Sequence, residues 1–179
     1  MASRRAKKTE KPWDPLWHLP ISPDDFIGYV PTPVPVVRRM LELAEIRRGE
    51  TVYDLGCGDG RILIRAVEDY GARGVGIDID GDRLDIARWR ARRHLRRIDF
   101  RRQNLFRANL RSADVVMIYL LPQLNEKLLP QLDRLRAGVR IISHSFELPG
   151  VVPDKTARRT IPGGLTHYIF FYRTPLRRA

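Results

Sequence analysis

Apolar and polar residues alternate along this chain with two different periods. Short apolar runs with the composition of buried strands are separated by longer segments whose apolar residues recur every three or four positions, as in amphipathic helices. The apolar runs predict strands at 51–55, 74–78, 99–104, 114–120 and 140–146. The segments between them predict helices at 61–70, 83–94 and 123–136.

The two ends of this alternation complete the predicted fold. Before the first strand, an apolar stripe predicts a helix that begins at Thr32, has two prolines in its first turn and ends by Gly49. After the last strand, residues 155–161 and 167–173 predict a hairpin. Together these elements indicate an α/β fold with a doubly wound, Rossmann-like sheet of seven strands and an antiparallel C-terminal hairpin. Because the run 114–120 is strongly apolar, we expect it at the centre of the sheet.

The first 28 residues have a different composition. They begin with basic residues and contain several prolines, which oppose helix and strand alike. We therefore predict an N-terminal arm at 1–28 ahead of one domain at 29–174. Trp13 and Trp17 indicate that the arm docks on that domain.

A glycine-rich turn follows the first predicted strand and carries the candidate chemistry. Gly56, Gly58 and Gly60 allow the backbone to adopt positive φ and to approach a ligand closely. In an open α/β sheet, ligands bind outside the carboxyl ends of the strands. Enzymes that bind NAD share this arrangement, so the glycines alone do not identify the ligand.

Two details of the turn separate the possible cofactors. A dinucleotide loop requires the pattern G-x-G-x-x-G/A, but counting from Gly56 the last position is Arg61. Asp54 and Asp59 flank the turn, and their carboxylates would repel a pyrophosphate in a poorly solvated pocket. S-adenosylmethionine has no phosphate and carries a cationic ammonium and a sulfonium, which carboxylates attract. The turn therefore predicts a site for S-adenosylmethionine.

The ends of the next two strands support this prediction. Asp78 ends the second strand, where an acid can accept hydrogen bonds from ribose hydroxyls. Asn104 ends the third, where a side-chain amide could meet the adenine edge. The alternative interpretation is that both are turn or cap residues, and for Asp80 a helix cap is the preferred interpretation.

The charge of the chain adds a second, competing indication. Lysine and arginine total 33 against 21 acidic residues, giving a net charge of +12 that would suit nucleic acid or another acidic partner. The alternative is that the excess, mostly arginine, is scattered over surface helices and tails.

The single cysteine and the hydropathy bound the setting. Cys57 excludes an internal disulfide, which makes a reducing cytoplasm the expected location. Since no apolar run approaches the ~18–20 residues of a membrane helix, we expect no membrane span. A cysteine-based zinc site is also excluded, and no metal site is predicted.

Four segments of the chain resemble a specific group of class I methyltransferases. The group comprises archaeal and bacterial broad-specificity protein-lysine methyltransferases and the mitochondrial lysine methyltransferases that modify the ATP-synthase c subunit and the adenine nucleotide translocase. The similar segments are Tyr29-Val30-Pro31-Thr32-Pro33, the glycine turn from Tyr53 to Ile62, Gly76-Ile77-Asp78 and Tyr119-Leu120-Leu121-Pro122.

The resemblance implies a role for each matching residue. Tyr29 and Thr32 would line the methionine end of S-adenosylmethionine, with Asp54 and Gly56 beneath it. Asp78 would hold the ribose. Asn104 would hold the adenine.

The fourth segment concerns the methyl acceptor. Many amine and amide methyltransferases have an Asp/Asn-Pro-Pro-Tyr/Phe motif here, which Tyr119-Leu120-Leu121-Pro122 does not match. This departure disfavours an adenine or glutamine acceptor. Tyr119 is the leading candidate for orienting an acceptor amine, Asn125 and His144 are weaker ones, and a histidine within a strand is more often structural.

Three functions follow from these residues. The leading hypothesis is a protein-lysine N-methyltransferase that acts by in-line transfer to a deprotonated amine on exposed lysines of protein substrates. The alternatives are a methyltransferase for RNA or a small molecule, which the charge favours, and a non-catalytic cofactor-binding interaction module. The sequence does not indicate an oligomeric state.

Overall fold

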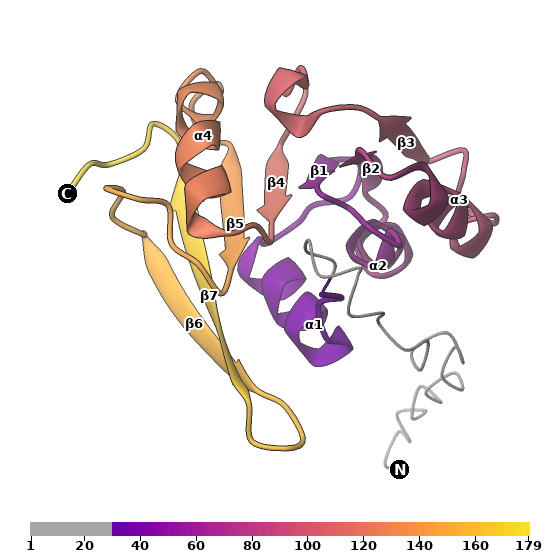
Figure 1. The fold of residues 1–179 in the computed structure, drawn as a ribbon, viewed down its shortest axis with the longest axis horizontal. Helices are drawn as coiled ribbons and strands as arrows, with labels where there is room; N and C mark the ends of the chain where they lie inside the picture. The colour runs from indigo at the N-terminus through magenta and orange to yellow at the C-terminus, as the bar shows by residue number, and fades with distance from the viewer. Residues whose placement is uncertain (1–29) are drawn as a thin grey trace, which may run out of the picture. The chain divides into compact units, whose positions relative to one another are not determined.

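One mixed sheet of seven strands organises the described part of the chain, which is residues 30–179 of the computed structural model (Figure 1). The strands are β1 (Thr51–Leu55), β2 (Arg73–Asp78), β3 (Ile98–Arg102), β4 (Val115–Ile118), β5 (Arg140–His144), β6 (Lys155–Thr160) and β7 (Thr166–Arg173). The helices are α1 (Val34–Leu43), α2 (Arg61–Tyr70), α3 (Gly81–Arg90), the short 3-10 helix η3 (Leu105–Arg107) and α4 (Pro122–Leu132). The arm predicted at 1–28 and the candidate Tyr29 lie outside the described residues.

The order of the strands confirms the predicted fold class. The sheet runs β3-β2-β1-β4-β5-β7-β6, with β1 to β5 parallel and β7 antiparallel to both of its neighbours. The apolar strand β4 is the central one, as expected from the run 114–120. From β1 the chain first builds outward to β3 and then crosses to β4, so a ligand crevice is expected above the carboxyl ends of β1 and β4.

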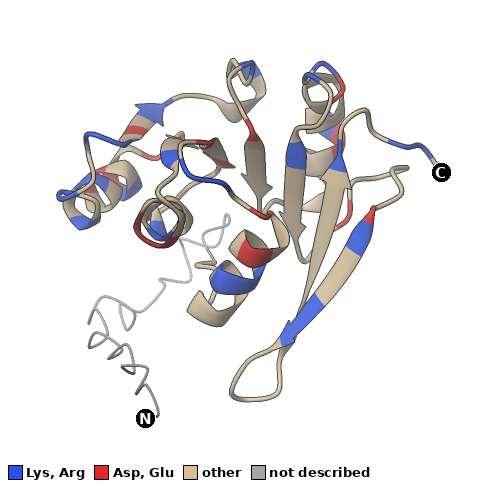
Figure 2. Ribbon diagram, turned by 180° about the vertical axis from the view of Figure 1, so that it is seen from behind, with Lys and Arg blue, Asp and Glu red and all other residues tan. Residues whose placement is uncertain are grey.

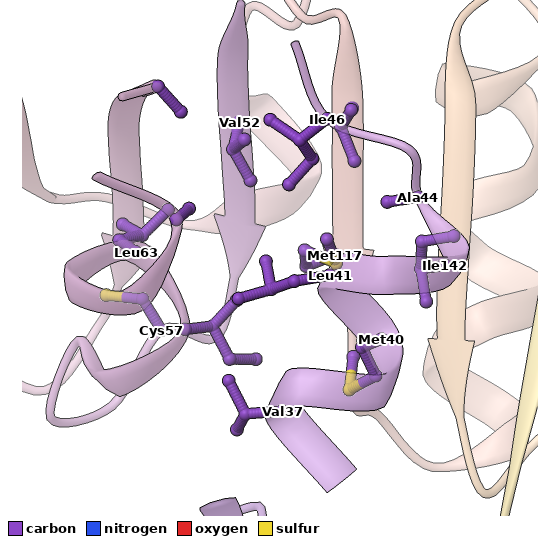
Figure 3. Close-up of a cluster of buried hydrophobic side chains, with 14 of the residues drawn as sticks. Val37, Met40, Leu41, Ala44, Ile46, Val52, Cys57, Leu63, Met117 and Ile142 are labelled. Atoms are coloured by element: carbon purple, nitrogen blue, oxygen red, sulfur yellow. The ribbon is translucent and has the colours of Figure 1, made fainter. Parts of the chain in front are cut away.

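Helices cover both faces of the sheet. On one face, Val52, Met117 and Ile142 pack against α1 and α2 (Figure 3). On the other face, the alternate residues of the same strands pack with Leu128 and Leu132 of α4. Because both faces are buried, the parallel strands are apolar at nearly every position, which is why they appear in the sequence as continuous runs.

Several helix ends differ from the predicted ones. The first helix stops at Leu43 instead of reaching Gly49, because Glu45 takes a left-handed conformation with φ of 50°. The helix predicted at 83–94 starts at Gly81, where Asp80 caps it through the backbone N–H groups of Asp82 and Arg83. Asp80 is thus a cap, as expected.

The chain between α1 and β1 is held by one buried arginine. Arg140, the first residue of β5, is 7% exposed and donates from Nη1 to the carbonyl oxygens of Ala44 (2.9 Å) and Glu45 (2.8 Å). Its Nη2 lies 2.7 Å from the carboxylate of Glu50. A single side chain therefore satisfies two carbonyl groups at the end of α1 and one carboxylate just before β1.

Replacing this arginine tests its contribution to stability. We expect Arg140→Met to lower the free energy of unfolding by about 3–5 kcal/mol, because it leaves buried acceptors and a carboxylate without a donor. Urea denaturation measures the difference. Arg158→Met, on the exposed strand β6, is the control and should change stability by less than about 0.5 kcal/mol. Equal effects of the two substitutions would contradict this account.

In the part of the chain that the structure describes, no helix has the length and apolar character needed to cross a membrane.

Candidate functional site

Four strand ends bring candidate residues to one edge of the sheet and to one face. Side chains alternate between the two faces of a strand, so Asp54 shares the face of Val52, which is covered by α1 and α2. By the same alternation Asp78 at the end of β2, Tyr119 just after β4 and His144 at the end of β5 belong to this face. The structure therefore gathers four of the predicted residues on one side of the carboxyl edge.

The glycine turn has the backbone conformation that the sequence predicts. Gly56, Gly58 and Gly60 have φ values of 83°, 51° and 74°. At Gly60 a Cβ atom would lie 2.8 Å from the ring of Phe100, so both conformation and space require glycine there. Gly56 is exposed, and its N–H donates to the carbonyl of Ile77 (2.8 Å), which fixes the turn against β2.

Asp59 holds the turn in place through two arginines. Its buried carboxylate accepts hydrogen bonds from Arg61 Nε (2.8 Å) and Nη2 (2.5 Å) and pairs with Arg90 of α3. Burial raises the pKa of Asp59, but the hydrogen bonds and charges of these arginines outweigh it, so the pKa lies below its ordinary value. Since two guanidinium groups already balance this charge, the geometry favours a role in holding the turn over direct contact with a cationic ligand.

Arg61 connects the turn to the beginning of α1. Besides its bonds to Asp59, it donates from Nη1 to the carbonyl oxygen of Thr32 (3.1 Å). Thr32, which the resemblance places at the methionine end of the cofactor, is thus held at a fixed position beside the glycine turn. The sequence used Arg61 only to exclude a dinucleotide and did not predict this contact.

Asp54 is the carboxyl group best suited to a positively charged ligand. It is 3% exposed, and among residues 30–179 no lysine or arginine forms an ion pair with it. Burial, together with the negative charges of Asp78 and Asp59, raises its pKa to about 8. A buried carboxyl group in this state ionises readily once a cation lies beside it.

Asp78 and Asn104 both make the local contacts of turn residues. The half-buried Asp78 carboxylate accepts from the N–H groups of Gly58 (2.8 Å) and Asp80 (3.0 Å). Asn104 is exposed, and its Oδ1 caps η3 by accepting from the N–H of Phe106 (3.0 Å). A carboxylate has further acceptor positions, and the Asn104 amide still has its NH₂ group, so neither contact prevents ligand binding.

Tyr119 lies beside a chain of hydrogen-bonded side chains that joins three parts of the fold. Its ring centroid is 3.9 Å from that of His144. His144 Nδ1 is 3.3 Å from Thr32 Oγ1, and its Nε2 is 2.9 Å from Nδ1 of His167 on β7. Burial, and then the neighbouring His167, lowers the pKa of His144 to about 3, so this ring is neutral at physiological pH. The sequence did not predict the participation of His167, because nothing local connects it to a residue 23 positions earlier.

Asn125 is placed differently from Tyr119 and His144. It is fully buried on α4, which covers the opposite face of the sheet, and its Nδ2 donates to the carbonyl of Glu147 (3.3 Å). Its Oδ1 has no hydrogen-bond partner among the described residues, so one acceptor on this side chain is unused. No contact joins Asn125 to Tyr119 within residues 30–179, and the contact to Glu147 is that of a structural residue.

Comparison with known proteins places this site in a family. Residues 54–155 match the family model described as ANTKMT methyltransferase domain. A protein-lysine N-methyltransferase from Saccharolobus islandicus is 39% identical over 82% of this chain and 92% of its own. This chain belongs to the ANTKMT methyltransferase family. The lysine N-methyltransferase of Xenopus laevis that is named for the C subunit of ATP synthase is 32% identical to this family member over 72% of the chain, which spans 57% of that relative.

A solved structure adds the ligand. A protein from Salinibacter ruber, described as an RNA methyltransferase and solved with S-adenosyl-L-homocysteine, is 44% identical, with a TM-score of 0.76 over 82% of this chain and 94% of that one. This ANTKMT family member is a methyltransferase that uses S-adenosylmethionine. The residues present fit that cofactor, since Asp54 offers a buried carboxyl without an ion-pair partner among residues 30–179 and Gly56 leaves the turn open above it.

The raised pKa of Asp54 predicts that cofactor binding is linked to a proton. At pH 7 the group is mostly protonated in the free protein and must ionise to face a cation, so binding of S-adenosylmethionine should release about one proton. Affinity should therefore increase as the pH rises toward 8. Calorimetry in buffers of different ionisation enthalpy measures the release. Asp54→Asn should abolish it and weaken binding about tenfold or more. The same release in both proteins would contradict the assignment.

The neutral His144 predicts a loss of stability in acid. Its pKa is about 3 in the folded protein and about 6.5 in the unfolded chain, so the unfolded chain binds more protons and stability falls as the pH drops from 6.5 toward 3. Between pH 7.5 and 4.5, wild type should lose about 2–3 kcal/mol more than His144→Gln. Chemical denaturation at the two pH values checks this, with His94→Gln, a half-buried histidine that faces Glu68, as the control. Equal losses in wild type and His144→Gln would refute it.

Proposed function

We propose that this methyltransferase transfers a methyl group to the side-chain amine of lysine in proteins. The observation that carries the proposal is the 39% identity to the protein-lysine N-methyltransferase of Saccharolobus islandicus, which extends over 92% of that protein. The lysine methyltransferases named for the C subunit of ATP synthase and for the adenine nucleotide translocase are further relatives. Protein substrates with exposed lysines are therefore the partners that we expect.

The residues at the carboxyl edge divide the work of binding. S-adenosylmethionine supplies an activated methyl group on a sulfonium cation. Asp54 stabilises the positively charged end of the cofactor, with Thr32 and Tyr29 beside it, and Gly56 gives the backbone room. Asp78 accepts hydrogen bonds from the ribose, and Asn104 contacts the adenine. Gly58, Gly60 and Asp59 keep the turn in the conformation that these contacts require.

The acceptor side of the site needs alignment and a neutral amine. Tyr119 orients the amine, and its position is fixed by the ring of His144. A free lysine has a pKa near ~10.4 and must lose a proton before it can attack. A poorly solvated slot beside a cationic sulfonium disfavours the ammonium form, and His144 adds no positive charge of its own because it is neutral. Holding amine and methyl carbon in line can then contribute several kcal/mol.

RNA is the second candidate acceptor. The Salinibacter ruber protein, described as an RNA methyltransferase, is 44% identical, and the net charge of +12 suits a polyanion. The cytoplasm is the proposed location, supported by a single buried cysteine that forms no disulfide.

Transfer of a labelled methyl group distinguishes the two acceptors. The protein is incubated with methyl-labelled S-adenosylmethionine and a native cell extract, and the product is divided between protease and ribonuclease. We expect the label to be lost with protease, to resist ribonuclease and to map to lysine by mass spectrometry. Asp54→Asn should reduce transfer at least tenfold, because it removes the charge that faces the cofactor, whereas Asp82→Asn on the exposed side of α3 should not. Label that only ribonuclease removes would sink the lysine proposal in favour of RNA.

A further inference from the structure

A basic groove lies at the amino ends of β1, β2 and β3, the opposite end of these strands from Asp54 and Asp78. The cavity measures about 920 Å³, and its charged lining comes from Arg48, Arg73, Arg96 and Arg97. These residues belong to the segments just before β1, at the start of β2 and just before β3. The cofactor site uses none of them, so the groove is a separate surface.

The positive charge of this basic groove is not neutralised by the protein. Within the described part of the chain, none of the four arginines forms an ion pair with a carboxylate. The acidic residue in the lining, Asp99, already pairs with Arg101 (2.7 Å). Nearby Glu50 is engaged by Arg140 (2.7 Å). Four guanidinium groups therefore face an open cavity with their charge available to a ligand.

Backbone hydrogen bonds fix the floor of the groove before any ligand arrives. Gly49 N–H donates to the carbonyl of Gly71 (3.1 Å), Arg73 N–H to that of Glu50 (2.8 Å) and Gly74 N–H to that of Arg97 (2.8 Å).

Two of the arginine side chains are also guided by Gly71. Arg97 Nη1 donates to its carbonyl oxygen (3.2 Å). Arg48 lies across it so closely that a Cβ atom there would be 3.2 Å from Arg48 Cγ. An array of arginines held in this way binds phosphate with little loss of conformational freedom, because the guanidinium plane matches phosphate oxygens in pairs.

The surface beside the groove indicates which polyanion it takes. Figure 2 shows basic residues along the connection that follows α3, where Arg92 and Arg93 are exposed. Trp89, at the end of α3, is 55% exposed, and the guanidinium of Arg92 lies 4.8 Å from its ring centroid. Exposed aromatic rings among arginines are typical of proteins that bind single strands, because unpaired bases stack on them. An acidic peptide would gain nothing from the indole.

We propose that the basic groove binds the phosphate backbone of single-stranded nucleic acid, with Trp89 as a stacking surface beside it. This site is distinct from the methyl-transfer site, since the two lie at opposite ends of β1 and β2. The proposal holds whether the methyl acceptor is lysine or RNA.

Binding of a fluorescently labelled 20-nucleotide oligouridine, followed by anisotropy over a range of salt concentrations, tests the proposal. The groove variant carries Arg48→Gln, Arg73→Gln and Arg96→Gln. A control variant with the same change in net charge carries Arg111→Gln, Arg134→Gln and Arg158→Gln, which are exposed elsewhere. We expect the groove variant to lose at least about tenfold in affinity at low salt. The slope of log K against log salt should fall by about two, because each single-strand phosphate contact contributes about 0.7. The control should keep both values near those of wild type.

Two outcomes would overturn the proposal. If both variants weaken binding equally, the oligonucleotide responds to net charge and not to this groove. If a polyglutamate peptide of similar length displaces the oligouridine at equal concentration, the groove binds carboxylates. Cofactor binding, measured in parallel by calorimetry, should be unchanged in both variants, which separates this test from that of methyl transfer.

Discussion

The buried carboxylate of Asp59 is the point on which the candidate site depends. Its two partners come from different elements, Arg61 from the start of α2 and Arg90 from the end of α3, and Arg61 also reaches the carbonyl of Thr32. One desolvated charge thus holds together the glycine turn, two helices and the segment before α1. If either arginine were lost, part of that charge would remain buried without compensation, so the arrangement persists only as a whole.

With the turn fixed in this way, parallel pairing does the rest of the assembly. β1, β2, β4 and β5 all point their carboxyl ends to the same edge, and alternation along each strand directs Asp54, Asp78 and His144 to the same face. The three acids near the turn then differ in state because their neighbours differ. Asp59 is ionised by arginines, whereas Asp54, buried beside two negative charges, has a pKa of about 8.

The sequence could predict what depends on local patterns. Strand alternation, the hairpin, the positive φ of the glycine turn and the cap at Asp80 each follow from residues close together in the chain, and the structure bears them out. Contacts between distant segments could not be predicted. With 33 lysines and arginines, nothing marks Arg140 as buried or Arg90 as the partner of Asp59, and the pairing of His144 with His167 depends on the register of β5 and β7.

The two outer strands have a consequence for how the molecule meets copies of itself. A sheet that ends in an unpaired strand offers free N–H and C=O groups on which another chain could add by strand pairing. β6 is exposed at five of its six positions and carries Lys155, Arg158 and Arg159, and β3 on the other side carries Asp99 and Arg102 at exposed positions. Bringing two β6 edges together would place like charges side by side. The charged side chains of these strands thereby oppose edge-to-edge aggregation by a means that requires no covering helix or loop.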